Sequence, residues 1–149
     1  MDQDLRAGVR VLARLALTTS RVCDESGISL VQYRLLQVIA EEPQRAGKLA
    51  ERLAVSRPTL TAAARALEDR GLVLRESVPG DGRGIQLRLT GAGEEAIDGA
   101  EGMIGKHLLG LGDEAAVRSM LRELVSLRAP LDKELRRMQR EENMEAARA

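Results

Sequence analysis

The sequence has almost no aromatic side chains, because Tyr33 is the only Phe, Trp or Tyr among 149 residues. Large aromatic anchors therefore cannot dominate a binding surface, and the core must be built from Leu, Ala, Val and Ile. Such a composition favours helices. Hydrophobic residues make up 44% and charged residues 31%, as in a soluble chain that can bury a core. The length fits one domain, or one domain with a dimerisation extension.

Cysteine and histidine are equally scarce, with Cys23 and His107 the sole examples. One cysteine excludes an intramolecular disulfide and a multi-cysteine zinc site, and a lone histidine cannot build a metal site. The glycine-rich segment 80–84 lies between two predicted strands and lacks Gly-Lys-Ser/Thr, so it is not a phosphate loop. We expect no metal, no cofactor and no catalytic centre.

Long apolar runs are absent as well. No uninterrupted run approaches the length that crosses a bilayer, and the acidic start MDQDLRAG differs from a signal peptide. We therefore expect a cytoplasmic protein without a membrane partner.

The net charge is zero, but the charges are segregated along the chain. Residues 29–93 carry ten basic and seven acidic side chains, a net of +3, whereas residues 94–149 carry nine basic and twelve acidic ones, a net of −3. A basic middle and an acidic end are compatible with nucleic-acid binding through the middle alone.

The middle of the chain begins with helix signals at short intervals. Ser29 and Gln32 predict a capping box for a helix that ends before Pro43. A short helix over 46–53, a three-residue turn and a helix capped by Ser56 follow. Two helices joined by so short a turn predict a helix-turn-helix.

The second of these helices is predicted to bury Leu60, Ala63, Ala64 and Leu67 and to end at Gly71. In a helix-turn-helix the second helix enters the DNA major groove, where arginine reads guanine and threonine contacts bases or a thymine methyl. The predicted DNA-facing set is Ser56, Arg57, Pro58, Thr59, Thr61, Ala62 and Arg65.

A hairpin is predicted next, with strands over 72–77 and 85–90 joined by the sequence PGDGRG. Arg83 sits at its tip between Gly82 and Gly84, and one arginine on a thin loop suits a narrow minor groove. Asp81 either supports that guanidinium or serves only to form the turn.

These motifs resemble the MarR (multiple-antibiotic-resistance regulator) family. The resemblance rests on Gln32-Tyr33, LAERLAVSRPTLT, LEDRGLV and the wing signature from Asp81 to Thr90, and it covers about residues 5 to 135. It implies a mainly α fold, more fully an α+β winged helix. The winged helix-turn-helix DNA-binding lobe spans 29–93, and the flanking segments 1–28 and 94–149 form a helical dimerisation region. Ala62 departs from the family, in which many members carry a basic residue there.

The resemblance also implies a function, that of a homodimeric, sequence-specific DNA-binding repressor. In this reading Arg83 enters the minor groove, Asp81 supports it, and a pseudopalindromic operator on double-stranded DNA has half-sites about 10 base pairs apart. Many members release DNA when a small phenolic or carboxylate effector binds between the dimer helices and the DNA-binding lobe. Arg10, Arg14 and Tyr33 are the candidates for that cleft. Alternatively, the arginines form a solvated helix face and Tyr33 belongs to the core.

The terminal segments supply the dimer in this interpretation. Leu5, Val9, Leu12 and Ala16 share one face of a predicted helix that ends near Asp24. A last helix begins after Asp113 and carries an apolar seam from Val117 to Met138. We expect it to bend at Pro130 and its tail to fray after Arg140.

Two other functions remain open at this stage. One is a protein-interaction module that keeps the helix-turn-helix shape but no longer binds DNA. The other is a redox-sensing regulator using Cys23, although the neighbouring acids Asp24 and Glu25 raise the pKa of a thiol and lower its reactivity.

Overall fold

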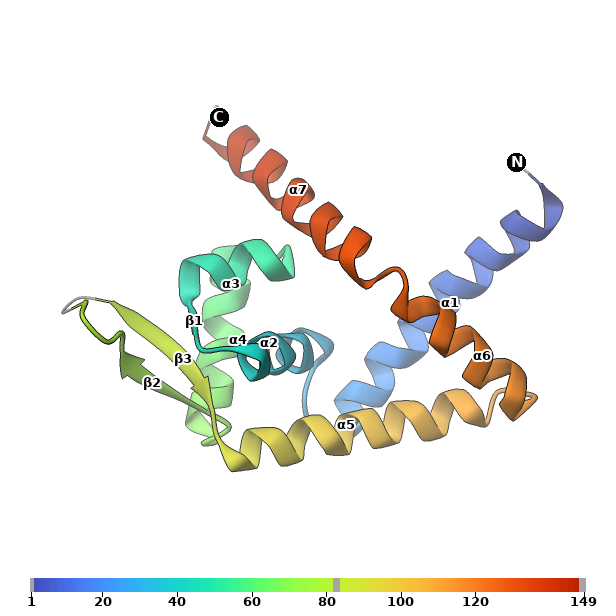
Figure 1. Ribbon diagram of the computed structural model, residues 1–149, viewed down its shortest axis with the longest axis horizontal. Coiled ribbons are helices and arrows are strands. Elements are labelled where there is room, and N and C mark those ends of the chain that lie inside the picture. Colours follow the sequence, from blue (N-terminus) through green and yellow to red (C-terminus); the bar gives the residue numbers. More distant parts are fainter. Residues whose placement is uncertain (1, 82–83, 148–149) are drawn as a thin grey trace.

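The computed structural model describes residues 2–81 and 84–147, and the chain there is mostly helical with one small sheet (Figure 1). This confirms the predicted α+β winged-helix class. The elements in chain order are α1 (Gln3–Glu25), α2 (Leu30–Glu41), β1 (Gln44–Arg45), α3 (Ala46–Leu53), α4 (Arg57–Asp69), β2 (Val73–Ser77), β3 (Ile85–Leu89), α5 (Gly91–Leu109), α6 (Glu114–Val125) and α7 (Arg128–Ala146).

The helix ends are fixed by local hydrogen bonds that the sequence predicted. Ser29 Oγ accepts a bond from Gln32 N at 3.2 Å, and Gln32 Oε1 accepts one from Ser29 N at 2.8 Å, which completes the capping box of α2. Helices α4, α5 and α6 begin with a single cap bond each, in which the side chain of Ser56, Thr90 or Asp113 accepts from a backbone N–H of the first turn. Each cap gives an otherwise unpaired backbone N–H a partner, which sets where the helix begins.

Helix α2 lies at the centre of the compact lobe and packs against α3, α4, α5 and β3. Its residues Leu35 and Leu36 are fully buried, as are Leu49 of α3 and Leu67 of α4. The apolar residues come from α2, α3, α4, β2, β3 and α5, so the lobe has one continuous core. Burying aliphatic side chains in this way is the main stabilising term for a chain without large aromatics.

The sheet is antiparallel, with strand order β1-β3-β2. The predicted hairpin is present, because Val73 pairs with Leu89 and Ser77 with Ile85. Strand β1 was not predicted; Gln44 and Arg45 pair with Leu87 and Gln86 on the other edge of β3. A two-residue strand has no alternation to recognise, so only the tertiary fold reveals it.

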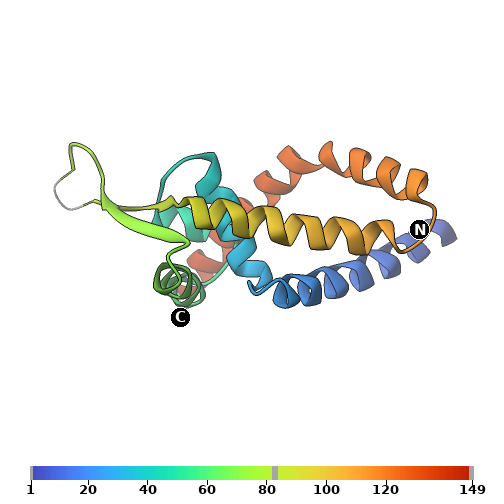
Figure 2. The same cartoon turned by 90° about the horizontal axis from the view of Figure 1, so that it is seen from below.

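The remaining helices extend away from the lobe. Helix α5 runs along one edge of the molecule, α1 packs against α5 and α2, and α6 turns back from the far end of α5 (Figure 1). Helix α7 then returns to the lobe and packs against α3; Figure 2 shows the same arrangement from below.

Two expectations for the last helix were wrong. The chain breaks at Ser126-Leu127, where α6 ends and α7 begins, rather than bending at Pro130. Pro130 instead lies in the first turn of α7, where its missing N–H removes no helical hydrogen bond. The segment after Arg140 does not fray either, because α7 continues to Ala146.

Candidate nucleic-acid interface and adjoining cavity

The turn between α3 and α4 contains a residue with a left-handed backbone conformation. Ala54 adopts φ 50° and ψ 52°, a conformation that is uncommon for a residue with a side chain. Buried residues on each side, Leu53 and Leu60, hold the two helices together across this turn. The turn therefore fixes the direction in which α4 leaves the lobe.

Helix α4 separates its residues into two faces. Its inner face is buried at the four predicted positions, Leu60, Ala63, Ala64 and Leu67. Among the described residues, neither Arg57 nor Arg65 forms an ion pair, so both guanidiniums are available to an external anion. The predicted DNA-facing residues are all exposed: Ser56, Arg57, Pro58, Thr59, Thr61, Ala62 and Arg65.

The N-terminal end of α4 is capped by Ser56. Ser56 Oγ accepts from Thr59 N at 3.3 Å and lies 2.8 Å from Thr59 Oγ1. These bonds hold the Thr59 side chain against the cap. The first N–H groups of a helix also carry a partial positive charge, which favours a phosphate at this end.

The wing, which is the hairpin of β2 and β3, is held by an arginine that was not among the predicted site residues. Arg45, at the end of β1, pairs with Asp81 at 2.8 Å, so it connects the turn of the hairpin to the start of α3. Within the turn, Val78 N donates to Gly84 O and Asp81 N donates to Val78 O. Arg83 and Gly82 lie outside the described residues, so the predicted minor-groove role of Arg83 stays a prediction. Only the β1–β3 pairing could have revealed Arg45.

A cavity of about 570 Å³ lies between α2, α3, α5 and α7. Its walls are strongly charged, because four arginines and three acids line it. The charged lining residues are Arg34, Arg52, Arg128, Arg136, Glu41, Glu101 and Asp132.

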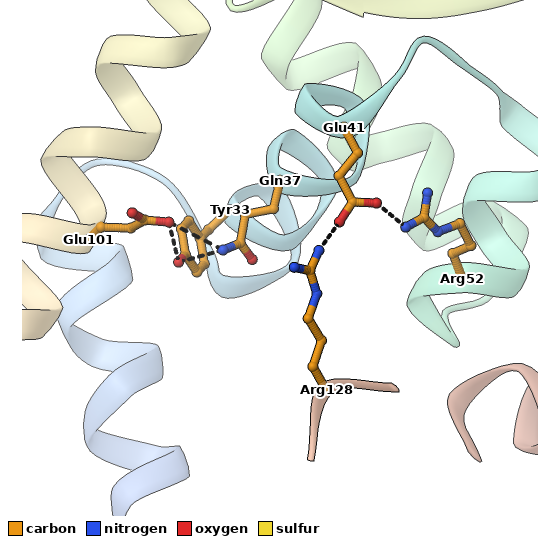
Figure 3. A network of polar contacts seen from close by, with 6 residues as sticks. All are labelled: Tyr33, Gln37, Glu41, Arg52, Glu101 and Arg128. Atoms are coloured by element: carbon orange, nitrogen blue, oxygen red, sulfur yellow. Dashed lines mark hydrogen bonds and ion pairs between the residues drawn. The ribbon is translucent and has the colours of Figure 1, made fainter. Parts of the chain in front are cut away.

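Glu41 organises one side of this cavity (Figure 3). Its two carboxylate oxygens each accept a bond from an arginine, Arg52 of α3 and Arg128 of α7. The hydrogen bond from Arg52, with the charge of Arg52 and the contacts of Arg128, holds the pKa of Glu41 below its ordinary value. One acid of α2 thus joins two other helices.

Tyr33, Gln37 and Glu101 form a second polar cluster between α2 and α5 (Figure 3). Tyr33 Oη donates to Glu101 Oε1 at 3.0 Å, and Gln37 Nε2 donates to Tyr33 Oη at 2.7 Å. Burial, followed by the charge of Glu101, raises the pKa of Tyr33 well above its ordinary value. Nearby, burial lowers the pKa of Arg34, and the charge of Asp132 offsets part of that shift. A half-buried arginine on a cavity wall is suited to hold an anion.

Residues 26–84 match the model of the MarR family. Residues 26–84 form a MarR-family domain. No curated protein matches the chain.

Several solved structures share the fold over most of the chain. NadR, in complex with 4-hydroxyphenylacetate, is 24% identical, with a TM-score of 0.66 over 89% of this chain and 94% of that protein. Transcriptional regulator Tm0710 from Thermotoga maritima is 29% identical, with a TM-score of 0.56 over 87% of this chain and 96% of its own. A mutant of S. aureus MepR bound to an oligodeoxyribonucleotide is 16% identical, with a TM-score of 0.60 over 88% and 99%.

The structure does not bring the predicted effector residues together. Arg10 and Arg14 are exposed on α1, and neither lines the cavity. Tyr33 is half-buried and packs against the core, while its partners Gln37 and Glu101 line the cavity. The residues that sequence reasoning missed, such as Arg34 and Arg128, come from helices distant in sequence. No local sequence pattern shows that these residues line one cavity.

Cys23 lies fully buried near the end of α1. Burial, with the charge of Asp24, raises the pKa of its thiol. A protonated, inaccessible thiol reacts slowly with oxidants. Its redox role stays a prediction that this environment disfavours.

The part of the chain that the structure describes has neither a metal-binding cluster nor a membrane-spanning helix. Its His, Cys, Asp and Glu side chains form no cluster of three or more suited to a metal ion. None of its helices combines the length and apolar character needed to cross a membrane.

Proposed function

We propose that the protein is a homodimeric, sequence-specific DNA-binding transcriptional regulator that acts as a repressor in the cytoplasm. The observation that carries this proposal is the two-sided character of α4, whose inner face is buried while Arg57 and Arg65 stay exposed and unpaired among the described residues. Ala62 and the threonines are small, which allows the helix to enter a major groove deeply. The DNA-bound MepR mutant, with the same fold, supports this use of the lobe.

The test is a titration with operator DNA selected from genomic fragments, repeated at several salt concentrations. Each arginine that contacts a phosphate contributes about one unit to the slope of log affinity against log salt. Arg83→Ala and Arg65→Ala are expected to weaken binding and flatten that slope, whereas Arg118→Ala on α6 serves as the control. If Arg118→Ala weakened DNA binding as much as the substitutions on the lobe, the proposed orientation of the protein on DNA would be contradicted.

We further propose that the lobe, residues 29–93, binds DNA and that 1–28 and 94–149 form the dimer. The support is the apolar surface that the protomer leaves exposed on its terminal helices, including Leu5, Leu12 and Leu131 at 57%, 61% and 56% exposure. In a two-fold dimer each protomer would present one α4 to a pseudopalindromic operator. The competing interaction-module function predicts no selected DNA at any salt concentration.

A small phenolic or carboxylate effector is proposed for the charged cavity between α2, α3, α5 and α7. The volume of about 570 Å³ suits such a molecule, and Arg34 offers a partly desolvated cation. The NadR complex with 4-hydroxyphenylacetate supports this ligand class. An effector shifts the DNA-binding equilibrium only if its affinity differs between the free and DNA-bound forms.

Calorimetric titration of phenolic carboxylates, beginning with 4-hydroxyphenylacetate, tests the effector proposal. Binding is expected to weaken in Arg34→Leu and to stay unchanged in Arg118→Leu. Equal affinity of both variants for the ligand would move the effector site away from this cavity.

A further inference from the structure

The C-terminal helix reaches the DNA-reading part of its own protomer. Helix α7 packs against α3, the first helix of the helix-turn-helix (Figure 1). Near its start, Arg128 binds Glu41, which also binds Arg52 of α3. The position of α7 on the lobe is therefore set by charged contacts as well as by packing.

The far end of α7 lies beside the helix-turn-helix turn. Gln139 is 3% exposed there, although it is a polar residue. A shallow depression is lined by Ala54, the turn residue, together with Met138, Gln139, Glu141, Glu142 and Glu145 of α7. In Figure 1 the C-terminal end of α7 lies on the same side of the lobe as α3, the helix that it packs against.

The two ends have opposite electrostatic character. The N-terminal end of α4 carries Arg57 and the positive end of the helix dipole, so it attracts anions. Glu141 at the end of α7 pairs with Arg137 at 2.7 Å, but Glu142 and Glu145 form no ion pair among the described residues. Both carboxylates line the same depression as Ala54, which stands three positions before Arg57 in the chain. A phosphate attracted to the start of α4 would approach this side of the lobe.

We propose that the acidic end of α7 is a built-in competitor of DNA for the N-terminal end of α4. In the free protein its carboxylates add negative charge beside the turn that precedes α4, and DNA binding requires that end of the helix to move aside. The proposal rests on the proposed DNA-binding function and adds a regulatory element to it. The partner that α7 excludes is the phosphate backbone.

The docking of the last turns of α7 beside the helix-turn-helix is suited to reversible release. The Oε1 atom of Gln139 is buried and accepts no hydrogen bond from any described residue, and its Nε2 reaches Glu142 and Asn143 only at 3.4 Å. An unsatisfied buried carbonyl weakens the docked state relative to a solvated one. The last two turns of α7 are otherwise exposed, so little apolar burial opposes their release.

The test compares the full-length protein with two variants that each lose two negative charges. The first, Glu142→Gln with Glu145→Gln, removes the unpaired carboxylates of α7. The matched control, Glu114→Gln with Glu123→Gln, removes two exposed carboxylates from α6. Each protein is titrated with the selected operator and with unrelated duplex DNA at several salt concentrations, after sedimentation confirms the same oligomeric state.

The α7 variant is expected to bind both DNAs roughly three- to tenfold more tightly than the unmodified protein at low salt, with the difference vanishing at high salt. The control is expected to match the unmodified protein. An α7 variant that binds no more tightly than the unmodified protein, or a control that gains as much, overturns the proposal while leaving DNA binding intact. If none of the three proteins binds DNA, both the competitor and the DNA-binding function are lost.

Hydrogen exchange of the unmodified protein gives a second readout. DNA is expected to increase amide exchange in residues 138–147 while protecting α4. Protection of both segments in the DNA complex would show that α7 stays docked, and the proposal would be abandoned.

Discussion

At the scale of single residues, Gly93 shows why one position of the lobe accepts no side chain. A Cβ there would lie 2.2 Å from Leu72 O and 2.6 Å from Leu89 Cδ1, both far inside van der Waals contact. Leu72 O belongs to backbone that also accepts a bond from Thr90 Oγ1, the cap of α5, so it cannot easily move. The close approach thus fixes where α5 leaves the sheet.

Gly93→Ala is expected to lower the free energy of unfolding by about 1–3 kcal/mol, since an overpacked site must distort its surroundings. Urea unfolding followed by circular dichroism measures the loss. Gly91→Ala is the matched control, because nothing lies within 4 Å of a Cβ at that position of the same helix. Equal stability of the two variants would show that the α5–β2 approach is looser in solution.

Tyr33 makes the stability of the protein depend on pH in the alkaline range. Burial and Glu101 raise its pKa above the ordinary value near 10, so the folded state disfavours the phenolate. A group with a raised pKa contributes its full stability below the unfolded-state pKa and loses it as the pH rises toward the folded-state pKa. The stabilising term therefore begins to disappear above about pH 10.

Tyr33→Phe removes this ionisation together with the bonds to Gln37 and Glu101. The variant is expected to be less stable than the unmodified protein at pH 7 and to lose less stability between pH 9 and 11. Thermal unfolding across that range gives the comparison. Parallel pH profiles would mean that Tyr33 is freely solvated.

At the scale of elements, local signals in the sequence predicted most of the fold and longer-range contacts produced the rest. Ser29, Ser56 and Asp113 predicted three helix starts correctly, because a cap bonds to residues only a few positions away. The strand at Gln44, by contrast, exists only because β3 lies beside it.

The candidate site also contains both residues that local spacing predicts and residues that only the tertiary fold brings together. The exposed face of α4 follows from helical periodicity, so Arg57 and Arg65 were found from spacing alone. The cavity gathers Arg34 and Arg128 from helices separated by more than half the chain, and the docking of α7 on α3 brings them together. Residue spacing within one helix does not show which residues of a distant helix will line the same cavity.

Helix α5 retains three glycines, Gly99, Gly102 and Gly105, that no neighbour in the protomer requires. Nothing lies within 4 Å of a Cβ built on any of them. Gly102→Ala is expected to raise the free energy of unfolding by about 0.5–1 kcal/mol, because alanine restricts the unfolded chain and favours a helix interior. Denaturant unfolding at low protein concentration measures the gain, and destabilisation would instead place another helix against this face.

At the scale of the whole molecule, the protomer leaves a large part of its apolar surface in water. The exposed residues concentrate on the helices outside the lobe, and Leu5, Val9 and Leu12 follow one stripe of α1 at 57%, 53% and 61% exposure. Scattered exposed leucines are ordinary, but a stripe along one helix face marks an interaction surface. A second copy of the chain is the occupant that the proposed regulator requires.

Leu12→Asp is expected to dissociate this dimer. Burying one leucine contributes about 1.5–3 kcal/mol, and a two-fold interface loses the contribution twice, so the dissociation constant should rise by about a hundredfold or more. Sedimentation equilibrium measures it directly. Leu74→Asp, on β2 with 47% exposure, introduces the same charge at an exposed leucine of the lobe and should leave the dimer intact.

Because one protomer presents a single α4, the monomeric Leu12→Asp protein should also lose most of its preference for a two-half-site operator over a single half-site. A Leu12→Asp protein that remains dimeric would move the interface from α1 to the exposed faces of α6 and α7.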